Sequence, residues 1–305
     1  MTLNKVVLSL SDCNAWLKSC ETSCTRNSTS PIPKHVHIIS LNRPFTFHEW
    51  LVVVSARKII KPDKITVYTD GQQNSCWWRR ALPYIEHQLI HLLPGSIVLN
   101  GVRIEKLAHT SDFLRVSILY HYGGIYMDTD SLSLNSFDPL LSNQVVLASQ
   151  CDHPAAIGVM MAQKHNCFIC KYAHRSCQKF NGGWITHSVG TMSGLIKEVD
   201  MEKEGLLVLP ARGGFYPMCW TTEGLHQLYS EDLDNISLYN KTEIYAVHLF
   251  GNKAVATIFP RTLNNMDWIH NNKSLVAIAV RKALPSGFSQ HHFNTTECAS
   301  LELDD

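Results

Sequence analysis

The chain has 305 residues, of which 45% are hydrophobic and 17% charged, so it has enough apolar material for a folded core. This composition excludes a disordered or fibrous protein. Lysine and arginine number 27 against 26 acidic residues, and the formal net charge of +1 provides no counter-charge for a polyanion. General binding of nucleic acid is therefore disfavoured.

The apolar runs of the chain are short. Trp50 to Val54 and Leu275 to Val280 fall far below the roughly 18 to 20 residues that cross a bilayer, so no membrane span is expected. The run from Val6 to Leu10 is also too short for the core of a secretory signal. Ten cysteines and five Asn-x-Ser/Thr sites nevertheless favour the secretory lumen, where disulfides persist. We expect either a cytosolic protein or a longer native product with a targeting segment ahead of this sequence.

The N-terminal region differs in composition from the rest. Residues 1–30 are rich in serine, threonine and cysteine, which predicts a polar stem or leader before a folded domain at 31–285. Residues 286–305 are expected to form a C-terminal tail. The leader cysteines Cys13, Cys20 and Cys24 are candidates for disulfides, whereas Cys167, Cys170 and Cys177 lack the partners of a structural zinc site.

The first elements of the domain alternate between strand and helix. His35 to Leu41 and Lys64 to Thr69 have the composition of short strands, and Phe47 to Ile60 has helical length between them. This order predicts a parallel α/β layer. A helix around Tyr84 to Leu93 and a strand near Ser96 to Leu99 are expected to continue it.

His87 and His91 would lie four residues apart on that predicted helix. This spacing suits zinc, but no third ligand is identifiable, so we interpret both as ordinary helix residues.

The most informative stretch runs from Ala108 to Leu134. Ser111 is a candidate N-cap of a helix that Gly123 and Gly124 end, because glycine tolerates the left-handed backbone. Asp112 and Arg115 are three residues apart, so both are expected on one face of the first turn.

A buried strand, Ile125 to Met127, follows this helix and leads to Asp128 and Asp130. The carboxyl end of a strand is the usual ligand edge of an α/β sheet. In an extended backbone, residues two apart point the same way, so both carboxylates should face one site. Two aligned carboxylates repel unless a cation lies beside them, and hard oxygen ligands suit Mn²⁺ or Mg²⁺. A second such triplet, Asp232 to Asp234, follows no strand and is interpreted as a solvated loop.

Two local resemblances are disfavoured. The strand and its Asp-Thr-Asp resemble a turn in family B DNA polymerases, but those enzymes are far longer and carry a basic template groove. The pattern also resembles the nucleophile strand of haloacid-dehalogenase phosphatases. Those proteins place it on the first strand and need a later acidic pair, whereas the only Asp-Asp here is at residues 304–305.

A third resemblance extends from about residue 31 to 255. The DXD sugar-binding region of glycosyltransferase family 32 is similar at His109, Ser111, Asp112, Arg115, Leu119, Tyr120, residues 122–126 and residues 128–130. Agreement continues at residues 32–34, Trp50, Ser55, residues 62–64, 68–70, 215–217 and 248–250.

The resemblance implies a GT-A fold: one α/β domain with a single, mainly parallel central sheet flanked by helices. It also implies a nucleotide-sugar donor and a divalent metal, Mn²⁺ or Mg²⁺. Asp112 and Arg115 then form the catalytic pair that contacts the donor sugar or its phosphate. Asp128 binds the ribose or the metal, and Asp130 binds the metal directly.

Two further residues follow from the same resemblance. His248 matches a histidine beside the metal and diphosphate, and Lys253 is placed to hold the leaving diphosphate. The sequence departs from the family after His248, where Phe250 stands in place of a nearby tryptophan. It departs again at residues 188–191, which lack the proline of an acceptor loop.

The predicted function is metal-dependent, retaining transfer of a hexose or N-acetylhexosamine from a nucleotide sugar, a UDP-sugar rather than GDP-mannose. The acceptor would be a glycan, glycolipid or glycoprotein. The alternatives are a catalytically inactive nucleotide-sugar or glycan-binding protein of the same fold and a DxD phosphohydrolase. Relatives of this family are Golgi membrane proteins, which implies a Golgi location.

Overall fold

The computed structural model describes residues 18, 20, 22–24, 29–90, 97–99, 101–231, 243–251 and 264–294. The strands are β1 (His35–Ser40), β2 (Lys64–Thr69), β3 (Glu86–Leu89), β4 (Val98–Leu99), β5 (Val102–Arg103), β6 (Gly124–Met127), β7 (Ser131–Ser133), β8 (Val145–Gln150), β9 (His153–Ala162), β10 (Leu206–Leu209) and β11 (Ala246–His248). The helices are α3 (Phe47–Ser55), α4 (Cys76–Ala81), α5 (Leu107–Tyr122), α6 (Cys167–Lys179), α7 (Val189–Glu198), α8 (Thr222–Tyr229), α11 (Met266–Asn271) and α12 (Leu275–Ala283). Short helical turns lie at η2 (Ala56–Ile60), η3 (Leu82–Tyr84), η4 (Asp138–Leu140) and η5 (Gln290–Phe293).

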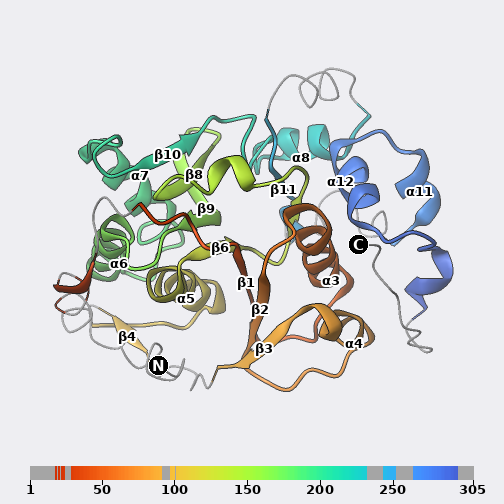
Figure 1. Cartoon of the computed structure of the whole chain (residues 1–305), viewed down its shortest axis with the longest axis horizontal. Coiled ribbons are helices and arrows are strands. Elements are labelled where there is room, and N and C mark those ends of the chain that lie inside the picture. The colour runs from red at the N-terminus through yellow and green to blue at the C-terminus, as the bar shows by residue number, and fades with distance from the viewer. Residues whose placement is uncertain are drawn as a thin grey trace.

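One seven-stranded sheet organises the fold, in the order β10-β8-β9-β6-β1-β2-β3 (Figure 1). Neighbouring strands are parallel except that β9 is antiparallel to both β6 and β8. The prediction of a single, mainly parallel sheet flanked by helices is therefore confirmed. The strands predicted at β1 and β2, and the helix between them, are confirmed as well.

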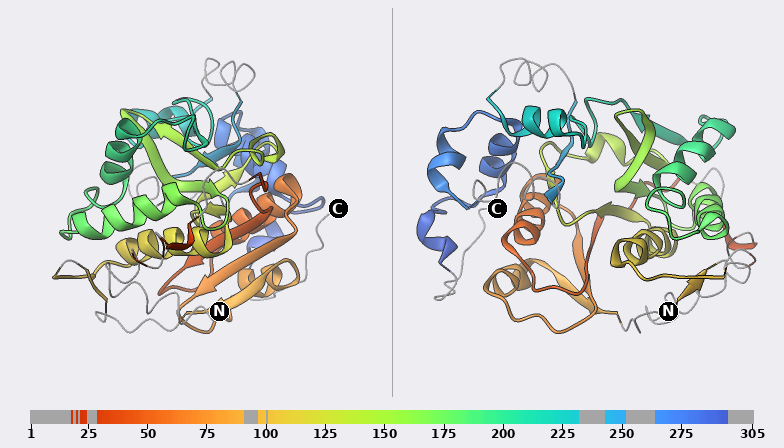
Figure 2. Two further views of the ribbon diagram at one scale, coloured as in Figure 1. Left: turned by 60° about the vertical axis from the view of Figure 1, so that its left-hand side comes forward. Right: turned by 180° about the vertical axis from the view of Figure 1, so that it is seen from behind.

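Helices cover both faces of the sheet, and Figure 2 shows these layers from two further sides. Residues of α5, α6 and α7 form one buried apolar cluster with one face of the sheet, and residues of α3, α4, α8 and α12 form another with the opposite face. Strand β6 contributes to both, because Ile125 and Met127 point to the second cluster while Tyr126 points to the first.

Two glycines let α5 turn directly into β6. Gly123 and Gly124 have φ angles of +66° and +103°, which residues other than glycine rarely adopt. A Cβ on Gly124 would lie 2.4 Å from the carbonyl oxygen of His35 in β1. The predicted end of the helix is confirmed, and the close approach sets β6 beside β1.

The start of α5 differs from the prediction. The helix begins at Leu107 with Lys106 as its N-cap, so Ser111 lies inside the helix and Asp112 and Arg115 lie beyond the first turn. The Lys106 side chain accepts no capping hydrogen bond, and lysine is not one of the residue types that mark an N-cap in a sequence.

The helix predicted around Tyr84 to Leu93 is wrong. Glu86–Leu89 form β3, which pairs in parallel with Thr66–Thr69 of β2. Hydrogen bonds to a strand distant in sequence overrode the local helical pattern. His87 therefore lies in a strand, where its Nε2 is 2.8 Å from Thr69 Oγ1, and His91 lies outside the described residues.

Disulfides tie the N-terminal leader to the domain. Cys20 pairs with Cys170 and Cys24 with Cys167, both on α6. Cys151 pairs with Cys219.

Near the other end, Phe288 stacks on Trp50 with ring centroids 5.5 Å apart. The division at residues 30 and 285 stays a prediction. Among the described residues, no helix is long and apolar enough to cross a bilayer.

Candidate active site

The Asp-Thr-Asp segment lies at the carboxyl end of β6, in a turn. The N–H of Ser131 donates to the carbonyl oxygen of Asp128 at 3.0 Å, so the chain bends directly after the strand. The prediction that an extended backbone aligns the two carboxylates is therefore wrong in its reason. A turn brings them to one site, because it folds Asp130 back beside Asp128.

His248 reaches the same place from β11. This strand pairs antiparallel with β7, with His248 opposite Ser131. Its Nε2 lies 3.5 Å from Asp128 Oδ2 and 3.3 Å from Asp130 Oδ1. Candidate ligand atoms of the three residues all lie within 4.8 Å of one another. The Gly251 N–H holds the other oxygen of Asp130 at 2.8 Å.

Arg115 links this cluster to α5. Its Nη1 lies 3.2 Å from Asp128 Oδ1 and 2.9 Å from the carbonyl oxygen of Ile157, and its Nη2 lies 3.1 Å from Asp112 Oδ1. The guanidinium sits over the Tyr126 ring, 4.5 Å from the centroid. The structure thus brings together five residues predicted from the sequence: Asp112, Arg115, Asp128, Asp130 and His248.

Charges in the cluster support one another. Burial opposes the charge of Asp128, but Arg115 and His248 outweigh it and hold the pKa of Asp128 below its usual value. Burial likewise opposes a charged His248, but Asp130 and Asp128 raise the pKa of its imidazole. The carboxylate of Asp128 is therefore ionised and available to a cation.

Space and ligand type suit a divalent metal. Asp128 and Asp130 provide hard oxygen ligands, and His248 adds an imidazole nitrogen. Gly158 of β9 lines the site: a Cβ there would lie 2.8 Å from Asp128 Oδ2 and 2.9 Å from the His248 ring. The absence of a side chain at this position keeps the cluster open.

The His248 ring needs one adjustment to bind a cation. The Phe250 N–H donates to its Nδ1 at 3.2 Å, so a neutral ring carries its hydrogen on Nε2, facing the carboxylates. Coordination through Nε2 requires that hydrogen on Nδ1, so the contact with Phe250 must open. The carboxylates fit a cation as they stand, whereas His248 fits it only when its contact with the Phe250 N–H is open.

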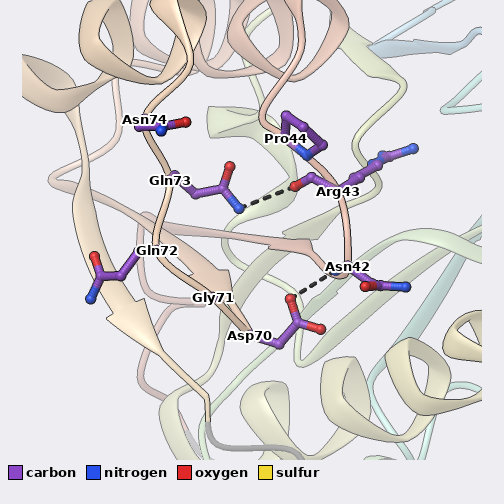
Figure 3. Close-up of a pocket in the computed structure, with 8 residues that line it drawn as sticks. All are labelled: Asn42, Arg43, Pro44, Asp70, Gly71, Gln72, Gln73 and Asn74. Atoms are coloured by element: carbon purple, nitrogen blue, oxygen red, sulfur yellow. Dashed lines mark hydrogen bonds between the residues drawn. The ribbon is translucent and has the colours of Figure 1, made fainter.

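A pocket of about 390 Å³ lies at the carboxyl ends of β1 and β2 (Figure 3). The Asn42 N–H donates to Asp70 Oδ1 at 2.7 Å, and Gln73 Nε2 donates to the carbonyl oxygen of Arg43 at 3.1 Å. Nη2 of Arg43 also donates to Thr129 Oγ1 at 2.7 Å. This hydrogen bond connects the pocket to the Asp-Thr-Asp turn.

Some functional candidates carry little or no sequence signal. A glycine inside a strand, as at Gly158, indicates a close approach but not what approaches it. His187 contacts Asp112 across 75 positions, and no local pattern marks it. Of the predicted residues, Lys253 lies outside the described part of the chain, as do Asp232 and Asp234.

Comparison with known proteins agrees with this geometry. Residues 51–147 match the glycosyltransferase sugar-binding region containing the DXD motif. Glucan organizing enzyme 1 of Cryptococcus neoformans var. grubii serotype A is 29% identical over 184 residues, 56% of this chain and 48% of that protein. The chain thus spans about half the length of that curated relative.

Several solved glycosyltransferases are similar at low identity. The galactosyltransferase LgtC, in complex with donor and acceptor sugar analogues, is 12% identical with a TM-score of 0.43, covering 82% of this chain and 94% of LgtC. The apo form of GlyE from Streptococcus pneumoniae TIGR4 is 12% identical with a TM-score of 0.43, covering 72% and 54%. PaToxG glycosyltransferase is 16% identical with a TM-score of 0.42, covering 64% and 78%.

The chain is an α/β protein with a mainly parallel sheet, and one segment of it is similar to the DXD sugar-binding region. More narrowly, residues 51–147 and the curated relative support the predicted resemblance to glycosyltransferase family 32.

Proposed function

We propose that this protein is a metal-dependent, retaining glycosyltransferase. It transfers a hexose or N-acetylhexosamine from a nucleotide sugar, a UDP-sugar rather than GDP-mannose, to a glycan, glycolipid or glycoprotein. The observation that carries the proposal is the convergence of Asp128, Asp130 and His248 beside the Asp112–Arg115 pair. Choice of donor base, acceptor class and retention of configuration rest on the family resemblance alone.

The chemistry needs electrophilic help at the leaving group. Breaking the bond from the anomeric carbon to phosphate leaves negative charge on the diphosphate. A bound Mn²⁺ or Mg²⁺, held by Asp128, Asp130 and His248, would neutralise that charge. We name no general base, because a retaining transfer needs no strong base to activate the acceptor.

The chain's own residues bind and orient the donor. Asp112 keeps a side chain that is 15% exposed, so its carboxylate can accept hydrogen bonds from donor-sugar hydroxyls. The Arg115 side chain is 6% exposed and serves Asp112 and Asp128. Its contact with the donor sugar or phosphate stays a prediction, as does the role of Lys253 on the diphosphate.

The pocket at Asn42, Arg43 and Asp70 is the proposed nucleoside site. It lies at the carboxyl ends of two parallel strands, where ligands of α/β sheets commonly bind. The hydrogen bond from Arg43 to Thr129 joins the pocket to the turn that carries Asp128 and Asp130, which supports a nucleotide whose diphosphate reaches the proposed metal.

We also propose that the protein works in the Golgi lumen. The disulfides that join the leader to α6 suit an oxidising compartment. Glycosidase sensitivity of the protein isolated from its native cells, together with microscopy against a Golgi marker, tests this. Absence of any N-glycan, with a diffuse cytosolic signal, would overturn the location.

A binding and turnover screen tests the function. Thermal shift and calorimetry are measured with UDP-glucose, UDP-galactose, UDP-N-acetylglucosamine and GDP-mannose, with Mn²⁺, Mg²⁺ or EDTA. Ligand at a hundred times its Kd stabilises the folded state by about 2.7 kcal/mol. We expect stabilisation by a UDP-sugar that needs metal, together with slow donor hydrolysis.

A variant pair sharpens this screen. Asp130→Asn should lose metal-dependent stabilisation, whereas Asp200→Asn, which changes an exposed carboxylate bonded to Lys203, should keep it. Full turnover by folded Asp130→Asn would contradict the proposal. Donor binding without turnover, under any acceptor mixture, would favour the inactive binding protein, and phosphatase activity without donor binding would favour the phosphohydrolase.

A further inference from the structure

A buried histidine, His187, contacts Asp112 from the segment between α6 and α7. Its side chain is 1% exposed, and its Nε2 lies 3.1 Å from Asp112 Oδ2. A carboxylate only accepts hydrogen bonds, so this contact places a hydrogen on Nε2. Asp112 is therefore held on both sides: by Arg115 at one oxygen and by His187 at the other.

The His187 ring has little freedom to turn. Phe113 stacks on it with centroids 5.3 Å apart and an interplanar angle of 18°. Phe180 and His109 meet it edge-on, with centroids at 5.0 and 4.6 Å. Because the ring is enclosed, its Nε2 keeps one position, and the hydrogen bond from Nε2 fixes the orientation of the Asp112 carboxylate.

An apolar side chain would fill this enclosure without polar cost. Among the described residues, Nδ1 of His187 is buried and has no hydrogen-bond partner. The contact of Nε2 with Asp112 is therefore the polar contact that offsets the cost of burying the ring. A buried polar atom without a partner costs free energy. The imidazole is thus better explained by what it does for Asp112 than by packing.

The two contacts leave Asp112 able to bind something else. A carboxylate offers about four acceptor positions, and Arg115 and His187 use one on each oxygen. The remaining positions of this 15% exposed side chain can accept two hydroxyl groups. Because both oxygens are fixed, the carboxylate accepts hydrogen bonds only from a pair of sugar hydroxyls that has the matching spacing and direction.

We propose that His187 is a positioning residue that fixes Asp112 for the hydroxyl pattern of the donor sugar. It acts on the donor sugar through its contact with Asp112. The proposal rests on the proposed function, since it assumes that a nucleotide sugar binds with its hexose at Asp112. It predicts that His187 affects recognition of the sugar and not of the nucleotide.

Three variants separate positioning from packing. His187→Phe keeps a ring in the enclosure and removes the Nε2 donor, whereas His187→Gln keeps a donor at about the same reach. Phe180→Leu loosens the packing around the same ring and leaves the contact with Asp112 in place. Each is measured by calorimetry with Mn²⁺, against UDP and against the UDP-sugar that binds wild type best.

We expect His187→Phe to weaken UDP-sugar binding about tenfold while UDP binding stays within about twofold of wild type. His187→Gln should recover most of the loss, and Phe180→Leu should keep the wild-type ratio of the two affinities. Equal loss for UDP and UDP-sugar in His187→Phe, or the same change in Phe180→Leu, would overturn the proposal in favour of packing.

A double-mutant cycle tests the route through Asp112. In an Asp112→Asn background, His187→Phe should change UDP-sugar affinity less than twofold, because the residue it positions is already altered. Additive losses would overturn the proposal. Failure of wild type to bind any nucleotide sugar would remove the proposed function itself, whereas wild-type binding with an unaffected His187→Phe would remove only the positioning role.

Discussion

Two histidines, the buried His37 and the partly buried His248, show how neighbouring residues decide the behaviour of one side-chain type. His37 lies in β1, with Nε2 2.9 Å from the Gly123 carbonyl oxygen and Nδ1 2.9 Å from the Tyr68 hydroxyl. Burial, with His35 nearby, lowers its pKa well below the ordinary value. The His248 side chain is 12% exposed, and Asp130 and Asp128 outweigh its partial burial and raise its pKa.

The difference separates a histidine with a structural role from one that we propose binds a metal ion. His37 has neutral partners at both nitrogens and fixes the glycine turn between α5 and β6. His248 faces two carboxylates that are short of positive charge, which a proton or a metal ion can supply.

Asp128→Asn should be the most damaging change. It removes a charge that Arg115 and His248 both face, and it leaves a buried guanidinium with Asp112 as its remaining carboxylate. Breaking a fully buried ion pair costs about 3 kcal/mol or more, and because the Asp128 side chain is 25% exposed we expect a loss of about 2–3 kcal/mol. Urea unfolding in EDTA should show that loss, and metal-dependent stabilisation should disappear.

Tyr126→Phe is the graded control for this change. It removes only the hydroxyl that donates to Asp128 Oδ1 at 2.6 Å, so it should cost about 1 kcal/mol and keep metal binding. Equal losses in the two variants would mean that the hydroxyl, and not the charge, stabilises the cluster.

Gly158→Ala should damage the site more than the fold. Its Cβ would meet Asp128 Oδ2 and the His248 ring at less than 3 Å, so both side chains must move apart. We expect Mn²⁺ affinity to fall about tenfold, with a stability cost of about 1–2 kcal/mol. Calorimetry with Mn²⁺ measures the first effect and urea unfolding the second.

Gly194→Ala is the matched control, since a Cβ there has no atom within 4 Å and the position lies inside α7. It should leave metal affinity unchanged and raise stability by about 0.5–1 kcal/mol. Wild-type metal affinity in Gly158→Ala would show that the cation does not sit between Asp128 and His248.

Acid should destabilise the protein through His37 and not through His248. The pKa of His37 in the folded state lies below the ordinary value of 6.5. Above that value neither state binds the proton, and below it only the unfolded chain does, so stability falls as the pH falls below it. His35, whose pKa burial and Lys64 lower to about 4, acts in the same direction.

His37→Gln removes this titration and keeps a donor for Gly123. Between about pH 6.5 and 5, it should lose about 1–2 kcal/mol less stability than wild type, although it starts lower at neutral pH. Urea unfolding across that range, in EDTA, measures both slopes. Identical slopes would assign the acid sensitivity to other groups.

Local sequence patterns predicted much of the frame around these residues. β-branched runs predicted β1 and β2, and Gly123–Gly124 predicted the end of α5, because each signal depends on residues close in the chain. The Asp-Thr-Asp motif predicted where the candidate site lies, although a turn and not an extended backbone brings its two carboxylates together. Local patterns failed at Glu86–Leu89, where pairing with β2 outweighs a helical appearance.

The rest of the site depends on contacts between distant residues. His187 meets Asp112 across 75 positions, and Gly158 meets His248 across the sheet edge. Sixteen histidines are alike in the sequence, and only their partners in space distinguish His37 from His248. The position of His248 came from family resemblance, and no spacing rule in this chain would have identified it.

The smallest effect should come from an exposed ion pair. It shows that a partner of opposite charge matters little when water surrounds the pair. Asp138 lies 2.6 Å from Lys34 Nζ, and this contact lowers the pKa of its carboxyl group. Its side chain is 57% exposed, however, so water and salt screen the pair. Asp138→Asn should therefore cost less than about 1 kcal/mol.

Salt dependence checks this last prediction. The cost of Asp138→Asn should shrink further in about 1 M NaCl, whereas the cost of Asp128→Asn should persist, because salt screens buried pairs much less. Urea unfolding of both variants at low and high salt makes the comparison. If Asp138→Asn lowered the free energy of unfolding as much as Asp128→Asn does, the strength of an ion pair would not depend on its exposure to water. The difference between His37 and His248 would then need another cause than the partly buried carboxylates beside His248.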